Sequence, residues 1–323
     1  MKVGFVLPQT ASDGDGGTWR EIAALARQAE SGGADSLWLC DHFLFRGADG
    51  SETGYHEPWT LLSALAAVTT RVELGTLVLA TTFRHPGLLA KMAATANEIA
   101  TGRLILGLGC GWHEPEYTAF GYPFDHRVGR FEEAVRATVP LLRGERVSFQ
   151  GRWSRLEDAV ILPPPRAPAP AVMIAANGER MQRITARFAD SWQTAWFGHP
   201  DERFSARRAQ LNAACAAEGR DPRTLAVTAG VMVGRPGEPA PADGRRVVCD
   251  ASAIAAALGA WAAAGADHVQ LGIPEKTPRT YEILLEGVRR FRGERRRSPD
   301  DRERAGSGPG GAAPGSPGAA RPG

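Results

Sequence analysis

Short apolar stretches alternate with longer segments of helical periodicity along most of the chain. The short stretches are rich in Val, Ile and Leu, and this alternation is typical of parallel strands joined by crossover helices. Eight strands are predicted, at residues 3–7, 36–40, 72–79, 103–108, 171–176, 191–194, 225–233 and 268–272. The sixth of these is short.

A helix is predicted after each strand, over residues 19–31, 59–69, 87–100, 127–142, 179–188, 201–218, 251–264 and 280–290. Three of these helices are followed by glycine just before the next strand, at Gly33, Gly102 and Gly265, as a left-handed C-terminal cap requires. The strands are apolar throughout and therefore covered on both faces. This favours a closed α/β fold, a (β/α)8 TIM barrel, over an open doubly wound sheet.

Two segments interrupt this rhythm. An insertion between the fourth helix and the fifth strand contains a predicted hairpin, at 147–149 and 153–156, and a proline-rich stretch over 163–170. Such an excursion is usually a lid or an oligomer contact. After residue 292 an arginine-rich run leads into Gly/Pro/Ala repeats, a composition that cannot bury a core. We therefore predict a catalytic domain over 1–292 and a disordered tail over 293–323.

Composition and charge narrow the classes of partner. The 323 residues carry 38 basic and 36 acidic side chains, so no nucleic-acid or membrane-surface partner is expected, and small ligands remain open. Four scattered cysteines form no C-x-x-C pair, and His113-Glu114 has no second His at helical spacing, so no metal is expected. With no secretory leader and no stretch long enough to span a bilayer, a cytoplasmic protein is expected.

Candidate chemistry is expected at the carboxyl ends of the strands, where the loops are free of packing duties. Asp41-His42-Phe43 directly follows the second strand, and an imidazole there can exchange a proton near neutral pH. A capping Asp in a polar loop explains the same residues equally well. The segment 107–112 (GLGCGW) has three glycines that permit close approach of a ligand, or only close packing of a loop.

The turn 176–179 (ANGE) leaves the fifth strand and opens a helix. Free backbone N–H groups and the helix dipole make such a turn a natural phosphate cradle, although Asn177 could equally be only an N-cap. No G-x-S-x-G elbow is present, so covalent hydrolase chemistry has no support.

Taken in order, these segments resemble the luciferase-like flavin-dependent oxidoreductases, from residue 3 to about residue 287. The resemblance is carried by the segments 3–5 (VGF), 37–43 (LWLCDHF), 57–59 (EPW), 74–76 (LGT), 83–86 (FRHP), 101–112 (TGRLILGLGCGW), 116–117 (EY), 120–121 (FG) and 189–192 (ADSW). Within that superfamily, segments 41–43 and 82–86 are most similar to members that use the deazaflavin coenzyme F-420.

This resemblance implies a bacterial-luciferase-like barrel with a cofactor at its mouth. The residues implied to hold the cofactor are Asp41, Leu77, Val78, Ala176, Asn177, Gly178 and Glu179. A non-proline cis peptide at Leu77–Val78 would support the ring, and the turn 176–179 would hold the phosphate.

Catalysis is expected from His42 as proton donor, with Asp41 beside it. Phe43, Trp112 and Trp196 are expected either to shape the substrate pocket or to pack under a loop. F-420-dependent sugar-phosphate dehydrogenases have Trp at the position of Arg46 and a catalytic Glu at the position of Trp112, so that activity is not expected.

The expected reaction is hydride transfer between coenzyme F-420 and a small organic substrate. One alternative is an FMN monooxygenase of the alkanesulfonate-monooxygenase type, which uses O2 and flavin reduced by a flavin reductase partner. Another is a barrel that binds flavin without catalysis. Because relatives are often dimers, a homodimer is also an expectation.

Overall fold

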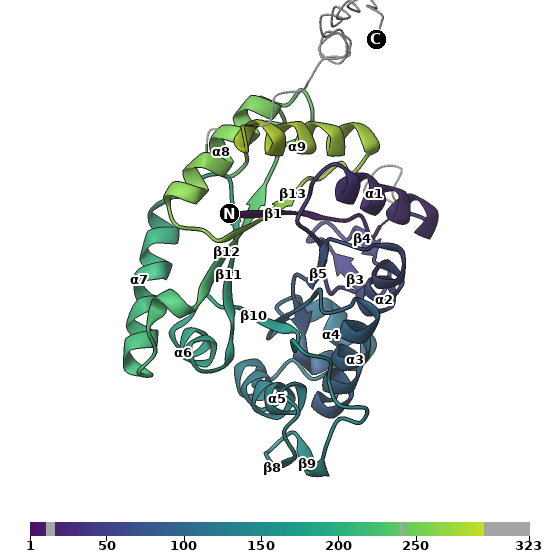
Figure 1. The fold of residues 1–323 in the computed structure, drawn as a ribbon, viewed down its shortest axis with the longest axis vertical. Helices are drawn as coiled ribbons and strands as arrows, with labels where there is room; N and C mark the ends of the chain where they lie inside the picture. Colours follow the sequence, from purple (N-terminus) through teal and green to yellow (C-terminus); the bar gives the residue numbers. More distant parts are fainter. Residues whose placement is uncertain (11–16, 240, 242, 294–323) are drawn as a thin grey trace, which may run out of the picture.

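The fold is a closed barrel of eight parallel strands (Figure 1). The computed structural model describes residues 1–10, 17–239, 241 and 243–293. In barrel order the strands are β1 (Lys2–Val6), β2 (Ser36–Leu39), β5 (Glu73–Thr76), β7 (Leu104–Gly109), β10 (Ala171–Ala175), β11 (Ser191–Phe197), β12 (Ala226–Met232) and β13 (His268–Gly272). Pairing of β13 with β1 and of β7 with β10 closes the barrel and confirms the predicted fold class.

In the described part of the chain eight helices surround the strands, and each predicted helix is present to within a few residues (Figure 1). They are α1 (Trp19–Ser31), α2 (Pro58–Val68), α3 (Pro86–Ile99), α5 (Arg127–Leu142), α6 (Glu179–Phe188), α7 (Glu202–Ala217), α8 (Ala251–Ala263) and α9 (Pro278–Phe291). The predicted glycine caps are also confirmed, since Gly33, Gly102 and Gly265 have φ values of +100°, +88° and +79°.

Several smaller elements were not predicted. A hairpin of β3 (Leu44–Arg46) and β4 (Glu52–Gly54) follows β2, and a short helix, α4 (Glu114–Phe120), follows β7. Two single turns of 3-10 helix cover Thr81–Phe83 and Pro222–Thr224.

Two predicted strands differ in extent. The third is not continuous over 72–79, because the chain leaves the ladder after β5 and rejoins it as β6 (Leu79–Ala80). The sixth is longer than predicted and reaches Phe197.

The predicted insertion hairpin is present as β8 (Val147–Gln150) and β9 (Arg155–Ala159), which lie beside α5 (Figure 1). The predicted disordered tail lies outside the described residues from position 294 onward. No helix of the described part has the length and apolarity that crossing a membrane would need.

The barrel interior is filled by large side chains and a small polar network. Trp38 packs there with Val6 and Met173, and its indole N–H donates to Ser36 Oγ at 2.7 Å. Ser36 Oγ also lies 2.7 Å from His268 Nε2, and burial lowers the pKa of His268 to about 3. The interior is therefore packed, and a ligand can enter only at an end of the barrel.

Candidate functional site

Five of the predicted site residues lie at or just beyond the carboxyl ends of five different strands. Asp41 comes after β2, Leu77 after β5, Trp112 after β7 and Gly178 after β10, and Trp196 lies near the end of β11. Since parallel strands of one barrel end at the same face, all five lie at one mouth. The strands that carry Leu77 and Gly178 are separated only by β7.

The exit of β5 has the irregular backbone that the resemblance implies. The peptide bond between Leu77 and Val78 is cis. Both side chains are half-buried and pack against the cluster of apolar side chains inside the barrel. On the neighbouring strand Gly109 leaves room for Val78, because a Cβ added to this glycine would lie 2.6 Å from Val78 Cγ2.

Asp41 ties the loop after β2 to the segment after β5. Its buried carboxylate accepts hydrogen bonds from Arg84 Nη1 (2.8 Å), Arg84 Nη2 (3.1 Å) and the Ala80 backbone N–H (2.8 Å). Arg84 also donates to Glu57 Oε1 at 2.6 Å. The bidentate pair with Arg84 fixes the Asp41 carboxylate. The carboxylate in turn fixes the backbone of Ala80, two residues beyond the cis peptide.

The electrostatics of this pair depend on burial and on mutual attraction. Burial raises the pKa of Asp41, and the guanidinium of Arg84 opposes that rise. Burial acts to lower the pKa of Arg84, but Asp41 and Glu57 outweigh it and the net shift is upward. Because Asp41 accepts all three of these hydrogen bonds, we assign it the carboxylate form. A carboxylate so engaged holds the surrounding backbone in place, and a catalytic role for Asp41 stays a prediction.

His42 is held by a carboxylate that was not predicted as a site residue. Its Nδ1 lies 2.9 Å from Oε1 of Glu116, on α4, and Oε2 of Glu116 accepts the backbone N–H of Phe43 at 3.0 Å. The Glu116 side chain is 2% exposed, and it stands in the first turn of its helix, where the helix dipole favours negative charge. Glu116 thus fixes both the ring of His42 and the loop that carries it.

Aromatic rings surround the His42 imidazole. The rings of Tyr55 and Trp112 have centroids 5.4 and 5.8 Å from its own, and Phe45 lies at 6.1 Å. Trp112 is 62% exposed, which is unusual for so large an apolar side chain. The imidazole therefore sits in an apolar enclosure that stays open on the side of Trp112.

The second histidine of this region, His113, has a structural role. Its Nε2 accepts the backbone N–H of Arg46 at 2.9 Å, and its ring stacks on Phe45 at a centroid distance of 4.3 Å. Burial lowers its pKa, so it is neutral at physiological pH. It holds the hairpin β3–β4 over the mouth.

Phe43 points into an aromatic cluster rather than standing alone. Its ring lies 4.6 Å from Phe83 and 5.0 Å from Phe120. Trp196 lies across the barrel, is 38% exposed, and packs over Gly230 of β12 and over Gly272, the last residue of β13. The peptide bond before Trp196 is also cis, which was not predicted. Lining of a substrate pocket by Phe43, Trp112 and Trp196 stays a prediction.

Hydrogen bonds anchor the turn after β10, and the space beside Gly178 in this turn is open. The Trp192 indole N–H donates to the Ala176 carbonyl at 2.7 Å, and Thr194 Oγ1 lies 3.3 Å from Asn177 Oδ1. Gly178 is the N-cap of α6, and no heavy atom lies within 4 Å of a Cβ added to it. The first turn of α6 thus faces open space.

A half-buried cation, Arg207 of α7, stands beside this turn. Its Nη1 donates to Thr194 Oγ1 at 2.9 Å. Burial and the neighbouring Arg203 lower its pKa, and within the described ranges no carboxylate forms an ion pair with it. An anion on the turn would compensate this charge.

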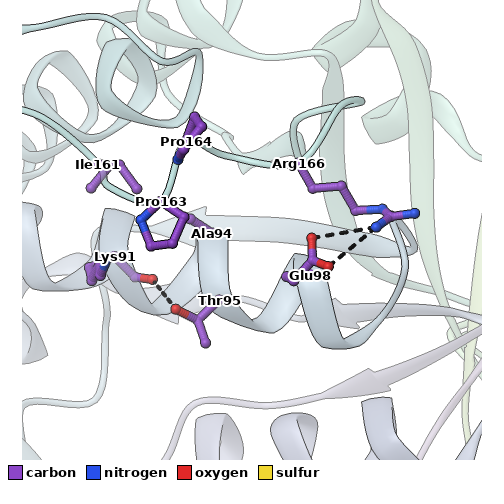
Figure 2. A pocket seen from close by; sticks show the side chains of 8 residues that line it. All are labelled: Lys91, Ala94, Thr95, Glu98, Ile161, Pro163, Pro164 and Arg166. Carbon is purple, nitrogen blue, oxygen red and sulfur yellow. Dashed lines mark hydrogen bonds and ion pairs between the residues drawn. The ribbon is translucent and has the colours of Figure 1, made fainter.

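Two other observations concern metal binding and a hollow outside the mouth. Among the described residues no group of three or more His, Cys, Asp or Glu side chains is placed to hold a metal ion. A hollow of about 380 Å³ between α3 and the segment 161–166 lies on the outer side of the barrel, closed at one end by the pair of Arg166 and Glu98 (Figure 2). None of its lining residues comes from a strand end, so it is separate from the mouth.

Sequence reasoning missed Glu116, Arg84 and Arg207 as site residues. Glu116 and Arg84 stood in motifs that carried the family resemblance, without a role assigned to them. A signal was present for Glu116, an acid in the first turn after a strand end. None was present for Arg207, whose position depends on how α7 packs against β11.

Comparison with known proteins agrees with this geometry. The family model described as luciferase-like monooxygenase matches residues 1–243. The phthiodiolone/phenolphthiodiolone dimycocerosates ketoreductase of Mycobacterium tuberculosis is 33% identical over 276 residues, which cover 77% of this chain and 72% of that protein. The F-420-dependent glucose-6-phosphate dehydrogenase of Kineococcus radiotolerans is 37% identical over 218 residues, 64% of this chain and 63% of the relative.

Solved structures share the fold at low sequence identity. An F-420-dependent secondary alcohol dehydrogenase has a TM-score of 0.75 and 17% identity, with 90% of this chain and 98% of that chain covered. A monooxygenase from Streptomyces bottropensis has a TM-score of 0.73 and 23% identity, with 89% and 98% covered. The chain therefore belongs to the luciferase-like monooxygenase family and is an oxidoreductase.

Proposed function

We propose that this enzyme transfers hydride between the deazaflavin coenzyme F-420 and a small organic carbonyl or alcohol. The observation that carries the proposal is the imidazole of His42 at the mouth, with Nδ1 fixed by the buried carboxylate of Glu116 at 2.9 Å. Reduction of a carbonyl by hydride also needs a proton, and a positioned imidazole is a suitable source. The similarity to a ketoreductase supports this substrate class.

The residues present fit such a cofactor. The open turn at Gly178, the free start of α6 and the cation of Arg207 suit the phosphate of its side chain. Leu77 and Val78 would support the ring, and Asp41 would hold the backbone around them through Ala80. When bound, the deazaflavin supplies the hydride chemistry, and the protein supplies orientation and a dry enclosure.

His42 would move the proton at Nε2. With Nδ1–H donated to Glu116, the neutral ring presents Nε2 as an acceptor, which can take the hydroxyl proton of an alcohol. In the opposite direction the imidazolium returns that proton to the carbonyl oxygen. Phe45, Tyr55 and Trp112 would keep bulk water from the ring while this happens.

Arg46 and Trp112 bear on the substrate. F-420-dependent sugar-phosphate dehydrogenases have Trp and a catalytic Glu at these two positions. An exposed indole at Trp112 suits an apolar substrate better than a sugar phosphate. We therefore propose an apolar ketone or secondary alcohol as the substrate class.

Anaerobic turnover tests the proposal. The purified enzyme is mixed with oxidised F-420 and a series of secondary alcohols, or with reduced F-420 and the matching ketones. The visible absorbance of the oxidised cofactor should fall in the first case and rise in the second. Oxygen consumption with reduced FMN and a flavin reductase, without turnover of F-420, would favour the monooxygenase alternative. Binding of neither cofactor would favour a non-catalytic barrel.

A further inference from the structure

A second hollow, of about 390 Å³, lies between the N-termini of α5 and α6. Its walls include His126, Arg127 and Gly129 of α5, Arg180 of α6 and Trp153 from the insertion hairpin. Both helices follow strands that end at the mouth, so the hollow opens on the same face as the site described above. Arg180 is two residues beyond Gly178, and the hollow therefore begins where the open turn ends.

The insertion hairpin is fastened in a way that places Trp153 in this wall. The Glu133 carboxylate of α5 accepts the backbone N–H groups of Arg152, Trp153 and Ser154, at 2.8, 2.9 and 3.1 Å. A Cβ added to Gly129 would lie 2.8 Å from the far end of the Trp153 ring, so a larger residue here would push the indole aside. The hairpin therefore runs back along α5 and delivers an aromatic ring to the start of that helix.

Two further arginines lie against this ring from outside the lining of the hollow. The guanidinium groups of Arg130 and Arg152 lie 5.2 and 5.1 Å from the centroid of the Trp153 ring. Arg130 and Arg180 are paired with acids, but among the described residues neither Arg127 nor Arg152 forms an ion pair with a carboxylate. The N-termini of α5 and α6 carry the positive ends of their helix dipoles, and both N-termini lie at this hollow.

The hollow on the opposite side of α6 is lined by a different set of residues. The hollow there, of about 450 Å³, is lined by Glu179, Gln182 and Gln210 together with several alanines. Its cation, Arg183, lies 3.7 Å from Glu218, and Arg180 on the other side is likewise paired, with Glu132 at 2.7 Å. The two sides differ in Arg127, which lines the first hollow and forms no ion pair with a carboxylate of the described residues. An anionic chain leaving the turn at Gly178 would therefore be drawn past Arg180 toward Arg127.

We propose that the groove formed by Arg127, Trp153 and Arg180 binds the anionic glutamate tail of the deazaflavin. This inference rests on the proposed function, because only F-420 carries such a tail beyond its phosphate and FMN does not. The carboxylates of the tail match the guanidinium of Arg127, which pairs with no carboxylate of the described residues, and that of Arg180, which shares Glu132. The indole packs against the apolar part of the glutamyl chain. The insertion thus contributes to cofactor recognition.

Fluorescence titration with two forms of the cofactor tests this proposal. One form carries the phosphate without glutamates, and the other carries a long glutamate tail. Exposed charge contacts are modest, so the wild-type protein should bind the long-tailed form roughly three- to tenfold more tightly at low salt. That preference should vanish at about 1 M salt, where the Debye length is about 3 Å.

Matched variants show which side of α6 is responsible for the preference for the long-tailed form. Arg180→Gln and Trp153→Ala should each remove most of the preference while leaving the affinity for the tail-free form unchanged. Arg183→Gln removes the same charge from the other side of the same helix and should keep the preference. Retained affinity for the tail-free form also shows that the variants are folded.

The failures are distinguishable. Equal wild-type affinity for the two forms, or equal losses in Arg180→Gln and Arg183→Gln, would overturn the tail groove and leave the proposed function intact. If the wild-type protein binds neither form, the proposed function fails and the groove fails with it.

Discussion

His42 and Glu116 are 74 positions apart in the sequence, yet Nδ1 of the imidazole lies 2.9 Å from Oε1 of the carboxylate. The contact joins the loop after β2 to the helix that follows β7. A buried carboxylate on one ring nitrogen fixes the tautomer and leaves the other nitrogen for chemistry. The proposed role of His42 therefore depends on Glu116 as a positioning residue.

Replacing Glu116 by Gln should slow turnover while leaving cofactor affinity unchanged. A neutral amide no longer stabilises the imidazolium, and we expect kcat to fall about ten- to hundredfold. Glu114 provides the matched control, because it is an exposed acid in the same helical turn. Steady-state kinetics of Glu114→Gln should match the wild type. Equal rates for Glu116→Gln and the wild type would remove the dyad from the mechanism.

Asp41→Asn should destabilise the protein strongly. The substitution removes the charge that compensates the buried Arg84 and leaves Glu57 as the charged partner in contact with it, and breaking a buried ion pair typically costs about 3–5 kcal/mol. The exposed pair of Arg46 and Glu52 offers a control, since Glu52→Gln should cost less than about 1 kcal/mol. Urea unfolding monitored by circular dichroism gives both values. A small loss for Asp41→Asn would show that the pair contributes little to the fold.

Stability should fall with decreasing pH because of His268. Burial lowers the pKa of this residue to about 3 in the folded state, against about 6.5 in the unfolded chain. Neutral His268 therefore contributes its full stabilisation above pH 6.5, and this contribution is lost as the pH falls toward 3. The free energy of unfolding should decrease by about 2 kcal/mol between pH 6.5 and 5. Urea unfolding at these two pH values measures the change. His268→Gln should weaken the dependence, and an unchanged dependence would assign it to other groups.

Gly178→Val should leave the fold intact and impair binding of a phosphorylated cofactor. The backbone of Gly178 has φ of −107°, which any residue can adopt, and the space around an added Cβ is open. The new side chain would instead occupy the place proposed for the phosphate. We expect about tenfold weaker binding of F-420 and an unchanged affinity for the deazaflavin riboside that lacks phosphate. Equal effects on both ligands would contradict phosphate binding at this turn.

The sequence predicted the barrel well because its signals are local. Apolar strands, amphipathic helices and glycines at Gly33, Gly102 and Gly265 each depend on a few neighbouring residues. Placement of Asp41 and Gly178 at one mouth also followed, since strand order and strand direction determine it. The cis peptide at Leu77–Val78 was implied by the resemblance, and periodicity alone predicted an unbroken third strand.

The partners within the site could not be predicted in this way. The contacts of Glu116 with His42 and of Arg84 with Asp41 join different β/α units, and they depend on the length and direction of each loop. The hairpin β3–β4 was missed because its strands are three residues each, too short for a periodic signal. The position of Trp153 depends on Glu133, a glutamate that sequence spacing does not distinguish from other acids.

Competitive binding of the two cofactors tests the central claim most directly. The apoprotein is dialysed against equal concentrations of F-420 and FMN, and the cofactor retained by the protein is identified by its absorbance. The account predicts that F-420 is retained in preference, and that Arg207→Gln reduces its retention. Preferential retention of FMN would contradict the account.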